Sequence, residues 1–142
     1  MSAPSSILFI CGMNSIRSPM AEVIARSLLP KGVFVQSAGI REGERDQFVE
    51  AVLAEVGLDL GSRQPRLYNE MADGFYDVIV TLTPEAHHRA LEITRTSAAE
   101  VIYWPTSDPT VLQGQGKREQ ILEAYRQVRD GITANIKEHF LK

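Results

Sequence analysis

A cysteine and an arginine lie close together near the start of the chain, with five residues between them. The segment reads Cys11-Gly12-Met13-Asn14-Ser15-Ile16-Arg17-Ser18, and it connects an apolar run to a helix-forming stretch that begins at Pro19. A loop that curls over a helix N-terminus can direct its backbone N–H groups at one point, where a tetrahedral dianion would bind. The sequence therefore predicts a phosphate-binding loop, called loop 11–18 below. Its expected substrate-binding residues are Gly12, Met13, Asn14, Ser15, Ile16 and Ser18.

Cys11 and Arg17 are the residue types that phosphoryl transfer needs in such a loop. The N–H groups and helix dipole that hold a dianion also favour a thiolate, and can lower a cysteine pKa from about 8.5 towards roughly 3.5 to 7.5. We therefore expect Cys11 to be ionised at neutral pH and to be the nucleophile. The planar guanidinium of Arg17 can bind two non-bridging oxygens and stabilise the transferring phosphoryl group.

Ser18 and Asn14 are predicted to support this loop. Ser18 stands directly before Pro19, so we expect it to cap the following helix, and its hydroxyl can also donate to the sulfur of Cys11. Asn14 tolerates a left-handed backbone, and its side-chain amide can tie a loop whose N–H groups point inward.

The spacing of Cys11 and Arg17 alone occurs often by chance, and a small buried cysteine near an unrelated arginine would also explain it. The context favours a functional site. A strand-forming run, a loop and a Ser-Pro helix start coincide here, and the thiol follows the carboxyl end of the predicted strand. Open α/β sheets bind their ligands at that edge.

Asp108 is a second candidate, in a loop after an apolar run at 101–104. The dipeptide Asp108-Pro109 by itself favours an ordinary turn. In a parallel sheet, however, the loops after the first and fourth strands emerge at the same edge, so Asp108 can reach a phosphate held by Arg17. Its carboxylic acid would protonate a leaving alkoxide or phenoxide, and the carboxylate would then activate water against a phosphocysteine. This chemistry requires no metal or organic cofactor.

The chain resembles the low-molecular-weight protein tyrosine phosphatases and their structural relatives, the arsenate reductases. The resemblance rests on Ile7-Leu8-Phe9-Ile10-Cys11, Asn14-Ser15-Ile16-Arg17-Ser18-Pro19-Met20-Ala21-Glu22, Ser37-Ala38-Gly39 and Asp108-Pro109. It implies that Cys11 is the nucleophile, Arg17 the phosphate-binding arginine and Asp108 the general acid. The positions that support the loop in this family are matched by Asn14, Ser18 and Ser37.

The sequence departs from the family pattern at two positions of the loop. The family usually has glycine third in the loop, whereas this chain has Gly12 second and Met13 third, so the local turn need not be the same. Many eukaryotic members carry a second cysteine directly before the arginine, and here that residue is Ile16.

Short apolar runs alternate with helical patterns along the chain. The expected strands are 7–10, 33–35, 77–81 and 101–104, and the expected helices are 19–29, 46–56, a shorter one from Pro84 and a last one from Lys117. This alternation predicts an α/β fold with a parallel sheet covered by helices on both faces. We expect one three-layer domain over residues 1–142, with the phosphate-binding loop after the first strand. The resemblance implies four strands in the order 2-1-3-4.

The composition of the chain limits the number of domains, the kinds of partner and the cellular compartment that we expect. At 142 residues and 44% hydrophobic content, the chain is large enough for one core and too short for two. A net charge of −3 without a basic stripe argues against nucleic acid as a partner, and no apolar run approaches the roughly 20 residues that span a bilayer. A single cysteine excludes a disulfide within the chain or a multi-cysteine metal site, and favours the cytoplasm. We expect a monomer or weak dimer.

The expected function is hydrolysis of phosphotyrosine in a phosphorylated protein, or of small aryl phosphates, through a phosphocysteine. Phosphate-like oxyanions should inhibit it. The mixed charges of segment 41–46 are typical of a solvated loop, and the resemblance implies that it forms one wall of the entrance. Few aromatic residues stand near the expected entrance: Ile40 has charged neighbours, and Asp108-Pro109 is followed by Thr110-Val111-Leu112. The wall that would bind a phenyl ring is therefore expected to be weak or rearranged.

Two other functions remain open. Tyr103-Trp104 and the segment 125–130 are similar to the arsenate reductases, which use the same anion cradle and thiolate attack. Because no second cysteine could relay the oxidation within the chain, such a reductase would need an external thiol. The third possibility is a catalytically weak anion-binding module whose loop at Gly12 and Met13 has lost turnover.

Overall fold

Four parallel strands form one sheet in the order β2-β1-β3-β4, as predicted. The computed structural model describes residues 4–71, 75–96, 98–112 and 116–141. The strands are β1 (Ser6–Met13), β2 (Phe34–Arg41), β3 (Val78–Thr81) and β4 (Glu100–Tyr103). Residues 7–12 of the central strand β1 are all buried, because β1 has a neighbouring strand on each side and helices pack on both of its faces.

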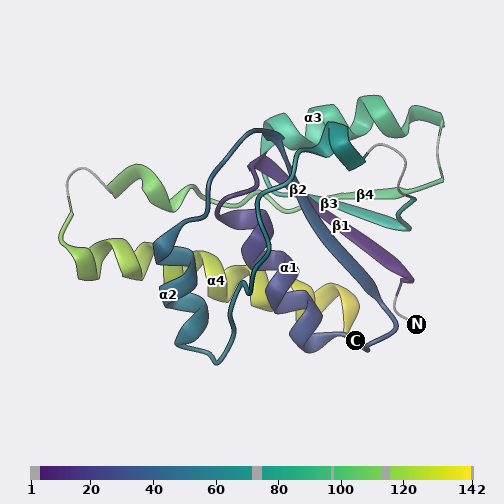
Figure 1. Ribbon diagram of the computed structural model, residues 1–142. Coiled ribbons are helices and arrows are strands. Elements are labelled where there is room, and N and C mark those ends of the chain that lie inside the picture. Colours follow the sequence, from purple (N-terminus) through teal and green to yellow (C-terminus); the bar gives the residue numbers. More distant parts are fainter. Residues whose placement is uncertain (1–3, 72–74, 97, 113–115, 142) are drawn as a thin grey trace.

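The helices form the outer two of three layers (Figure 1). They are α1 (Arg17–Leu28), α2 (Gln47–Ala54), α3 (Pro84–Ile93) and α4 (Arg118–Phe140), with short 3-10 turns η1 (Tyr68–Met71), η2 (Thr94–Thr96) and η3 (Pro109–Leu112). Helices α1, α2 and α4 pack on one face of the sheet, whereas α3 and η1 pack on the other. The α/β architecture inferred from the alternating pattern is confirmed.

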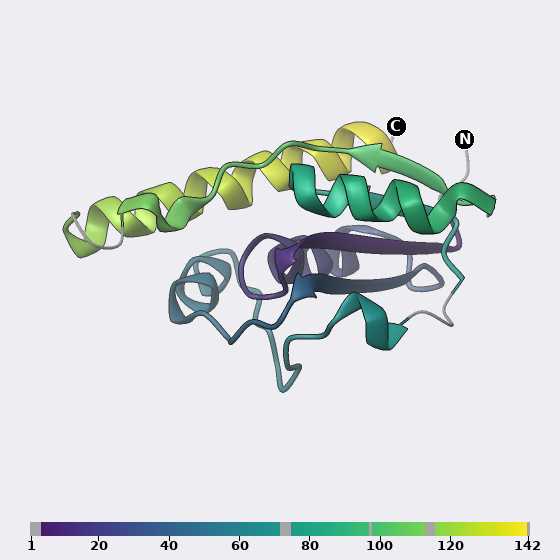
Figure 2. The same cartoon turned by 90° about the horizontal axis from the view of Figure 1, so that it is seen from above.

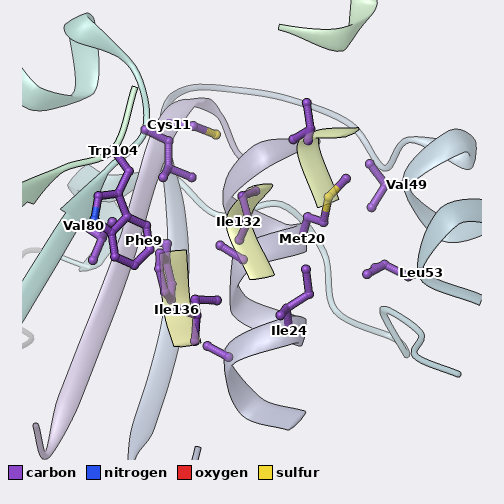
Figure 3. Packing of buried hydrophobic residues seen from close by; sticks show 14 of the residues in the cluster. Phe9, Cys11, Met20, Ile24, Val49, Leu53, Val80, Trp104, Ile132 and Ile136 are labelled. Carbon is purple, nitrogen blue, oxygen red and sulfur yellow. The ribbon is translucent and has the colours of Figure 1, made fainter. Parts of the chain in front are cut away.

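Strand alternation places Cys11 on the side of α1 and α4. Ile7, Phe9 and Cys11 belong to the larger apolar core with these helices, whereas Leu8 and Ile10 face α3. Figure 3 shows Cys11 at one end of the larger core, near Trp104, with the side chains of α1 and α4 beside it.

Helix α4 runs along this core for 23 residues (Figure 2). Its apolar face includes Tyr125, Ile132 and Ile136, each at most 2% exposed, and the hydroxyl of Tyr125 donates to the carboxylate of Asp46 at 2.8 Å. Asp46 also accepts the N–H groups of Phe48 and Val49, so it caps α2 rather than belonging to it. Within the described ranges, no helix is both long and apolar enough to cross a bilayer.

Two boundaries near loop 11–18 differ from the prediction. Strand β1 continues through Met13, which pairs with Arg41, so the first three residues of the expected loop are extended. Helix α1 begins at Arg17, and the expectation that Ser18 caps it is wrong: Ile16 is the N-cap, without a side-chain cap. The reason is that the buried hydroxyl of Ser18 lies against Cys11 and Asn14 instead.

Candidate active site

Cys11 lies in the last part of β1, and its side chain is almost completely buried. Its thiol donates to the carbonyl oxygen of Met13, and Ser18 Oγ lies 2.9 Å from the sulfur. The carbonyl of Met13 also accepts the N–H of Ser15 at 2.8 Å, which closes a tight turn. A carbonyl oxygen therefore faces the sulfur of the free protein at the place where the sequence predicts an inward-pointing N–H group.

This environment disfavours the ionised thiol that the sequence predicts. Burial raises the pKa of Cys11, and this effect exceeds the opposing influence of hydrogen bonds from the side chain and backbone of Ser18, the charge of Arg17 and a backbone contact at Met13. In the free protein the pKa of this thiol therefore lies above its ordinary value, and Cys11 is protonated at neutral pH.

Strand β2 packs directly against loop 11–18 at Gly39. A Cβ atom at Gly39 would lie 2.4 Å from the backbone nitrogen of Asn14 and 2.8 Å from the carbonyl carbon of Met13. No larger residue fits there without moving the loop. The glycine of Ser37-Ala38-Gly39 is thus explained by close approach of two backbones, with no left-handed conformation involved.

Asn14, Ser18 and Ser37 meet behind the sulfur. The amide nitrogen of Asn14 donates to Ser18 Oγ at 2.8 Å and to Ser37 Oγ at 3.0 Å, so it ties the loop as predicted. The left-handed backbone that asparagine tolerates is not used at Asn14, since no described residue other than glycine has a positive φ.

Arg17 connects the start of α1 to the loop that follows β4. Its Nη1 donates to the carbonyl oxygen of Thr106 at 3.0 Å, two residues before Asp108. The side chain of Asp108 is exposed, and its Oδ1 accepts the N–H of Thr110 at 2.9 Å and the Thr110 hydroxyl at 2.6 Å, which caps η3. The structure thus brings Cys11, Arg17 and Asp108 to one edge of the sheet.

The charge state of Asp108 follows from these contacts. Partial burial raises its pKa, but the hydrogen bonds from Thr110 and the nearby charge of Arg17 together outweigh burial and lower the pKa below its ordinary value. Asp108 is a carboxylate in the free protein at neutral pH, so it must gain a proton before it can act as an acid.

The entrance to the site is charged rather than aromatic. Arg41 and Glu85 form an ion pair beside Gly12, where a Cβ would meet Arg41 Nη2 at 3.2 Å and Glu85 Oε1 at 3.4 Å. Met13 is 46% exposed next to this pair. On the other side, Ser15 Oγ accepts the N–H of Glu44 at 2.9 Å, so segment 41–46 lies against the loop as expected.

A cavity of about 390 Å³ is lined by the segment 105–109, which includes Asp108. It separates the segment 105–109 from the middle of α4, where Gly131, Gln127 and Asn135 line it. Trp104, directly before this segment, is 5% exposed and packs on Phe9, which settles its place as a core residue.

Sequence reasoning missed a group of charged residues behind loop 11–18. The carboxylate of Glu22 is completely buried and lies near the guanidinium groups of Arg26, Arg63 and Arg66. One signal was available: Glu22 stands one helical turn after Ser18, so both share the buried face of α1. Nothing local marks the two arginines of the 63–66 segment.

Comparison with known proteins agrees with this geometry. Residues 6–140 match the family model described as "Low molecular weight phosphotyrosine protein phosphatase". An arsenate reductase of Bacillus subtilis (strain 168) is 30% identical over 132 residues, which cover 93% of this chain and 92% of that protein. A protein-arginine-phosphatase of Geobacillus stearothermophilus is 32% identical over 103 residues, 63% of this chain and 70% of that one.

Among solved structures, an arsenate reductase in its phosphate-binding state superposes with a TM-score of 0.76 at 27% identity. The superposition covers 97% of this chain and 95% of that one. The arsenate reductase structure therefore shares the fold of this chain, and relatives with both kinds of name match more than half of its length.

Proposed function

The chain belongs to the low molecular weight phosphotyrosine protein phosphatase family, and we propose that it hydrolyses phosphomonoesters through a phosphocysteine on Cys11. The observation that carries this proposal is the hydrogen bond from Arg17 to Thr106, which holds the loop of Asp108 next to the arginine that would bind the phosphoryl group. This bond supports the proposal because displacement at a phosphoryl group held by Arg17 needs the acid on a loop next to that arginine.

The first step forms a sulfur–phosphorus bond and breaks the phosphorus–oxygen bond of the ester. Before attack, the thiol of Cys11 loses its proton to solvent and the carbonyl of Met13 turns away from the sulfur. The Ser18 hydroxyl then donates a hydrogen bond to the thiolate, and Arg17 binds two oxygens of the phosphoryl group. The electron pair of the broken bond goes to the ester oxygen, which takes a proton from Asp108.

The second step releases phosphate. The carboxylate of Asp108 removes a proton from a water molecule, and the water oxygen attacks phosphorus. The sulfur–phosphorus bond breaks, and Cys11 leaves as a thiolate. The first step needs Asp108 in its protonated form, which the free protein lacks. The dianionic phosphoryl group of the bound substrate raises the pKa of the Asp108 carboxyl by like-charge repulsion and so favours that form.

We infer that the substrate is a phosphorylated protein, at phosphotyrosine, or a small aryl phosphate, and that phosphate-like oxyanions compete with it. Family membership supports this substrate class, whereas the charged entrance at Arg41 and Glu85 supports a weak grip on the phenyl ring. A cytoplasmic location fits an enzyme whose single cysteine must stay reduced.

A second candidate is arsenate reduction, which the names of the similar arsenate reductases favour. The thiolate of Cys11 would displace water from arsenate and form a sulfur–arsenic(V) bond. An external thiolate would then attack the sulfur, so that a disulfide forms and two electrons pass to arsenic, which leaves as arsenite. Because Cys11 is the only cysteine, that second thiol must come from another molecule.

A third candidate, an anion-binding module with weak turnover, is supported by the Met13 carbonyl that faces the sulfur. The test that separates the three is hydrolysis of p-nitrophenyl phosphate in EDTA, together with glutathione-dependent reduction of arsenate. We expect hydrolysis that is lost in Cys11→Ser and strongly reduced in Asp108→Ala, with Asp59→Ala as an exposed control. Arsenate reduction without hydrolysis would select the reductase, and phosphate binding without either reaction would select the binding module.

A further inference from the structure

Glu22 is a completely buried carboxylate next to loop 11–18. Its Oε1 accepts the hydroxyl of Ser37 at 2.6 Å and Arg66 Nη1 at 3.1 Å. Its Oε2 lies 3.1 Å from Arg26 Nη1 and 3.3 Å from Arg63 Nε. A buried charge needs such partners, because an unpaired carboxylate in an apolar environment is strongly unfavourable.

Arg63 differs from the other two arginines in burial and in what its N–H groups contact. Its side chain is 8% exposed, against 32% for Arg66 and 47% for Arg26. Its Nη2 donates to Asn14 Oδ1 at 2.6 Å and to Ser37 Oγ at 2.9 Å. Within the described part of the chain, its Nε has no aligned hydrogen bond. The charge of Arg63 thus faces Glu22, while its donors are directed at Asn14 and Ser37.

Asn14 connects Arg63 to the sulfur of Cys11 through a chain of hydrogen bonds. Its Oδ1 accepts Arg63 Nη2 and also the backbone N–H of Arg66 at 2.9 Å, which fixes which end of the amide is the acceptor. The opposite end must then donate, and it reaches Ser18 Oγ at 2.8 Å. Because Ser18 accepts this bond, its hydroxyl proton can point to the sulfur of Cys11 at 2.9 Å or to the carbonyl oxygen of Ala38 at 3.3 Å, and the sulfur is the nearer of the two.

We propose that Arg63 is a positioning residue that favours the thiolate of Cys11 by fixing the orientation of the Asn14 amide and, through it, the donor hydroxyl of Ser18. The proposed role of Arg63 rests on the proposed function, but its test measures the titration of the Cys11 thiol and the binding of phosphate, not turnover. Failure of hydrolysis and failure of this inference are therefore distinguishable.

Arg63 could instead serve only to neutralise the charge of Glu22, but several other groups also do this. Without Arg63, the carboxylate still contacts Arg26, Arg66 and Ser37. Arg26 lies about as far from Glu22 Oε2 as Arg63 does. Removing Arg26 therefore takes away a similar charge but leaves every contact of Asn14 in place. Arg26→Ala is therefore the matched control for Arg63→Ala.

The experiment measures the pH dependence of Cys11 alkylation by iodoacetamide and the affinity for inorganic phosphate in the intact chain. For Arg63→Ala we expect the alkylation midpoint to rise by about one pH unit and phosphate to bind about tenfold more weakly. Arg26→Ala should keep the wild-type midpoint. Millimolar guanidinium chloride should restore the midpoint of Arg63→Ala, because the free ion can donate to Asn14 from the vacated site.

Arg63→Lys keeps the charge but not the planar fork, so we expect a raised midpoint with a native circular dichroism spectrum. The inference is overturned if Arg63→Ala and Arg26→Ala have the same midpoint and phosphate affinity. Should Arg63→Ala fail to fold, a wild-type midpoint in Arg63→Lys overturns it instead.

Discussion

The guanidinium of Arg17 donates to the carbonyl oxygen of Thr106 across 3.0 Å, although 89 positions separate the two residues in the chain. This bond joins the first residue of α1 to the loop that carries Asp108. It uses one nitrogen of the guanidinium, so the remaining donors of the planar group can bind an oxyanion while the bond to Thr106 persists. In the proposed mechanism, this bond links anion binding by Arg17 to the position of Asp108.

Arg17→Lys tests the need for a planar guanidinium at this position. A lysine keeps the charge but cannot donate to Thr106 and grip two phosphoryl oxygens at once, so we expect kcat/KM for p-nitrophenyl phosphate to fall by about 100-fold or more. Arg89→Lys, on the surface of α3, is the control and should keep wild-type kinetics. Unchanged kinetics in Arg17→Lys would exclude the proposed role of Arg17.

The free protein should contain a protonated thiol. Because burial raises the pKa of Cys11, the alkylation rate with iodoacetamide should increase with pH and reach its midpoint above about 8.5, the value of an unperturbed cysteine. The rate is measured by mass spectrometry of the intact chain, in which Cys11 is the only thiol. A midpoint below neutral pH would show that loop 11–18 already stabilises a thiolate without a bound anion.

Gly39→Ala tests the close approach of β2 to loop 11–18. The added methyl group would lie 2.4 Å from the Asn14 nitrogen, so we expect a loss of about 1–3 kcal/mol in the free energy of unfolding and a large loss of activity. Gly32→Ala is the control, because a Cβ there meets no atom within 4 Å. Urea unfolding and p-nitrophenyl phosphate kinetics give both readouts, and equal stability of the two variants would contradict the packing described.

Glu55 should make stability depend on pH in the acid range. Hydrogen bonds from Arg126, then Arg129, lower its pKa from 4.5 to about 2. Since the folded-state pKa is the lower one, the stabilisation is complete above pH 4.5 and disappears as the pH falls towards about 2. In urea unfolding over this range, Glu55→Gln should show a weaker pH dependence than wild type, whereas Glu123→Gln, 3.5 Å from Arg126, should not.

The sequence predicts most helices and strands because they have local signals, but of β2 (Phe34–Arg41) it predicts only the start, at 33–35. The apolar run before Cys11 and the periodic apolar positions of α4 each reflect contacts within a few residues. The sheet order came from the family resemblance and agrees with the structure. The boundary at Ser18 was missed because a buried thiol and an asparagine compete for its hydroxyl, which no local pattern reveals.

The sequence predicted which side chains of the candidate site lie together, but it did not predict the charge state of the Cys11 thiol. Cys11, Arg17 and Asp108 gather at one sheet edge because parallel strands end there. The protonated thiol was not foreseen, since it depends on how deeply the sulfur is buried and on the direction of one carbonyl group at Met13. Arg63 escaped notice because 49 positions separate it from Asn14, its partner in the fold.

The most direct test of the proposed mechanism is to trap the covalent intermediate. Asp108→Ala is mixed with p-nitrophenyl phosphate, whose leaving group departs without an acid, and the reaction is quenched in acid during turnover. Mass spectrometry of the intact chain and of the peptide that contains Cys11 should then show one added phosphoryl group on the sulfur, and none in Cys11→Ser. Release of p-nitrophenol with no phosphoryl group on Cys11 at any quench time would contradict the account.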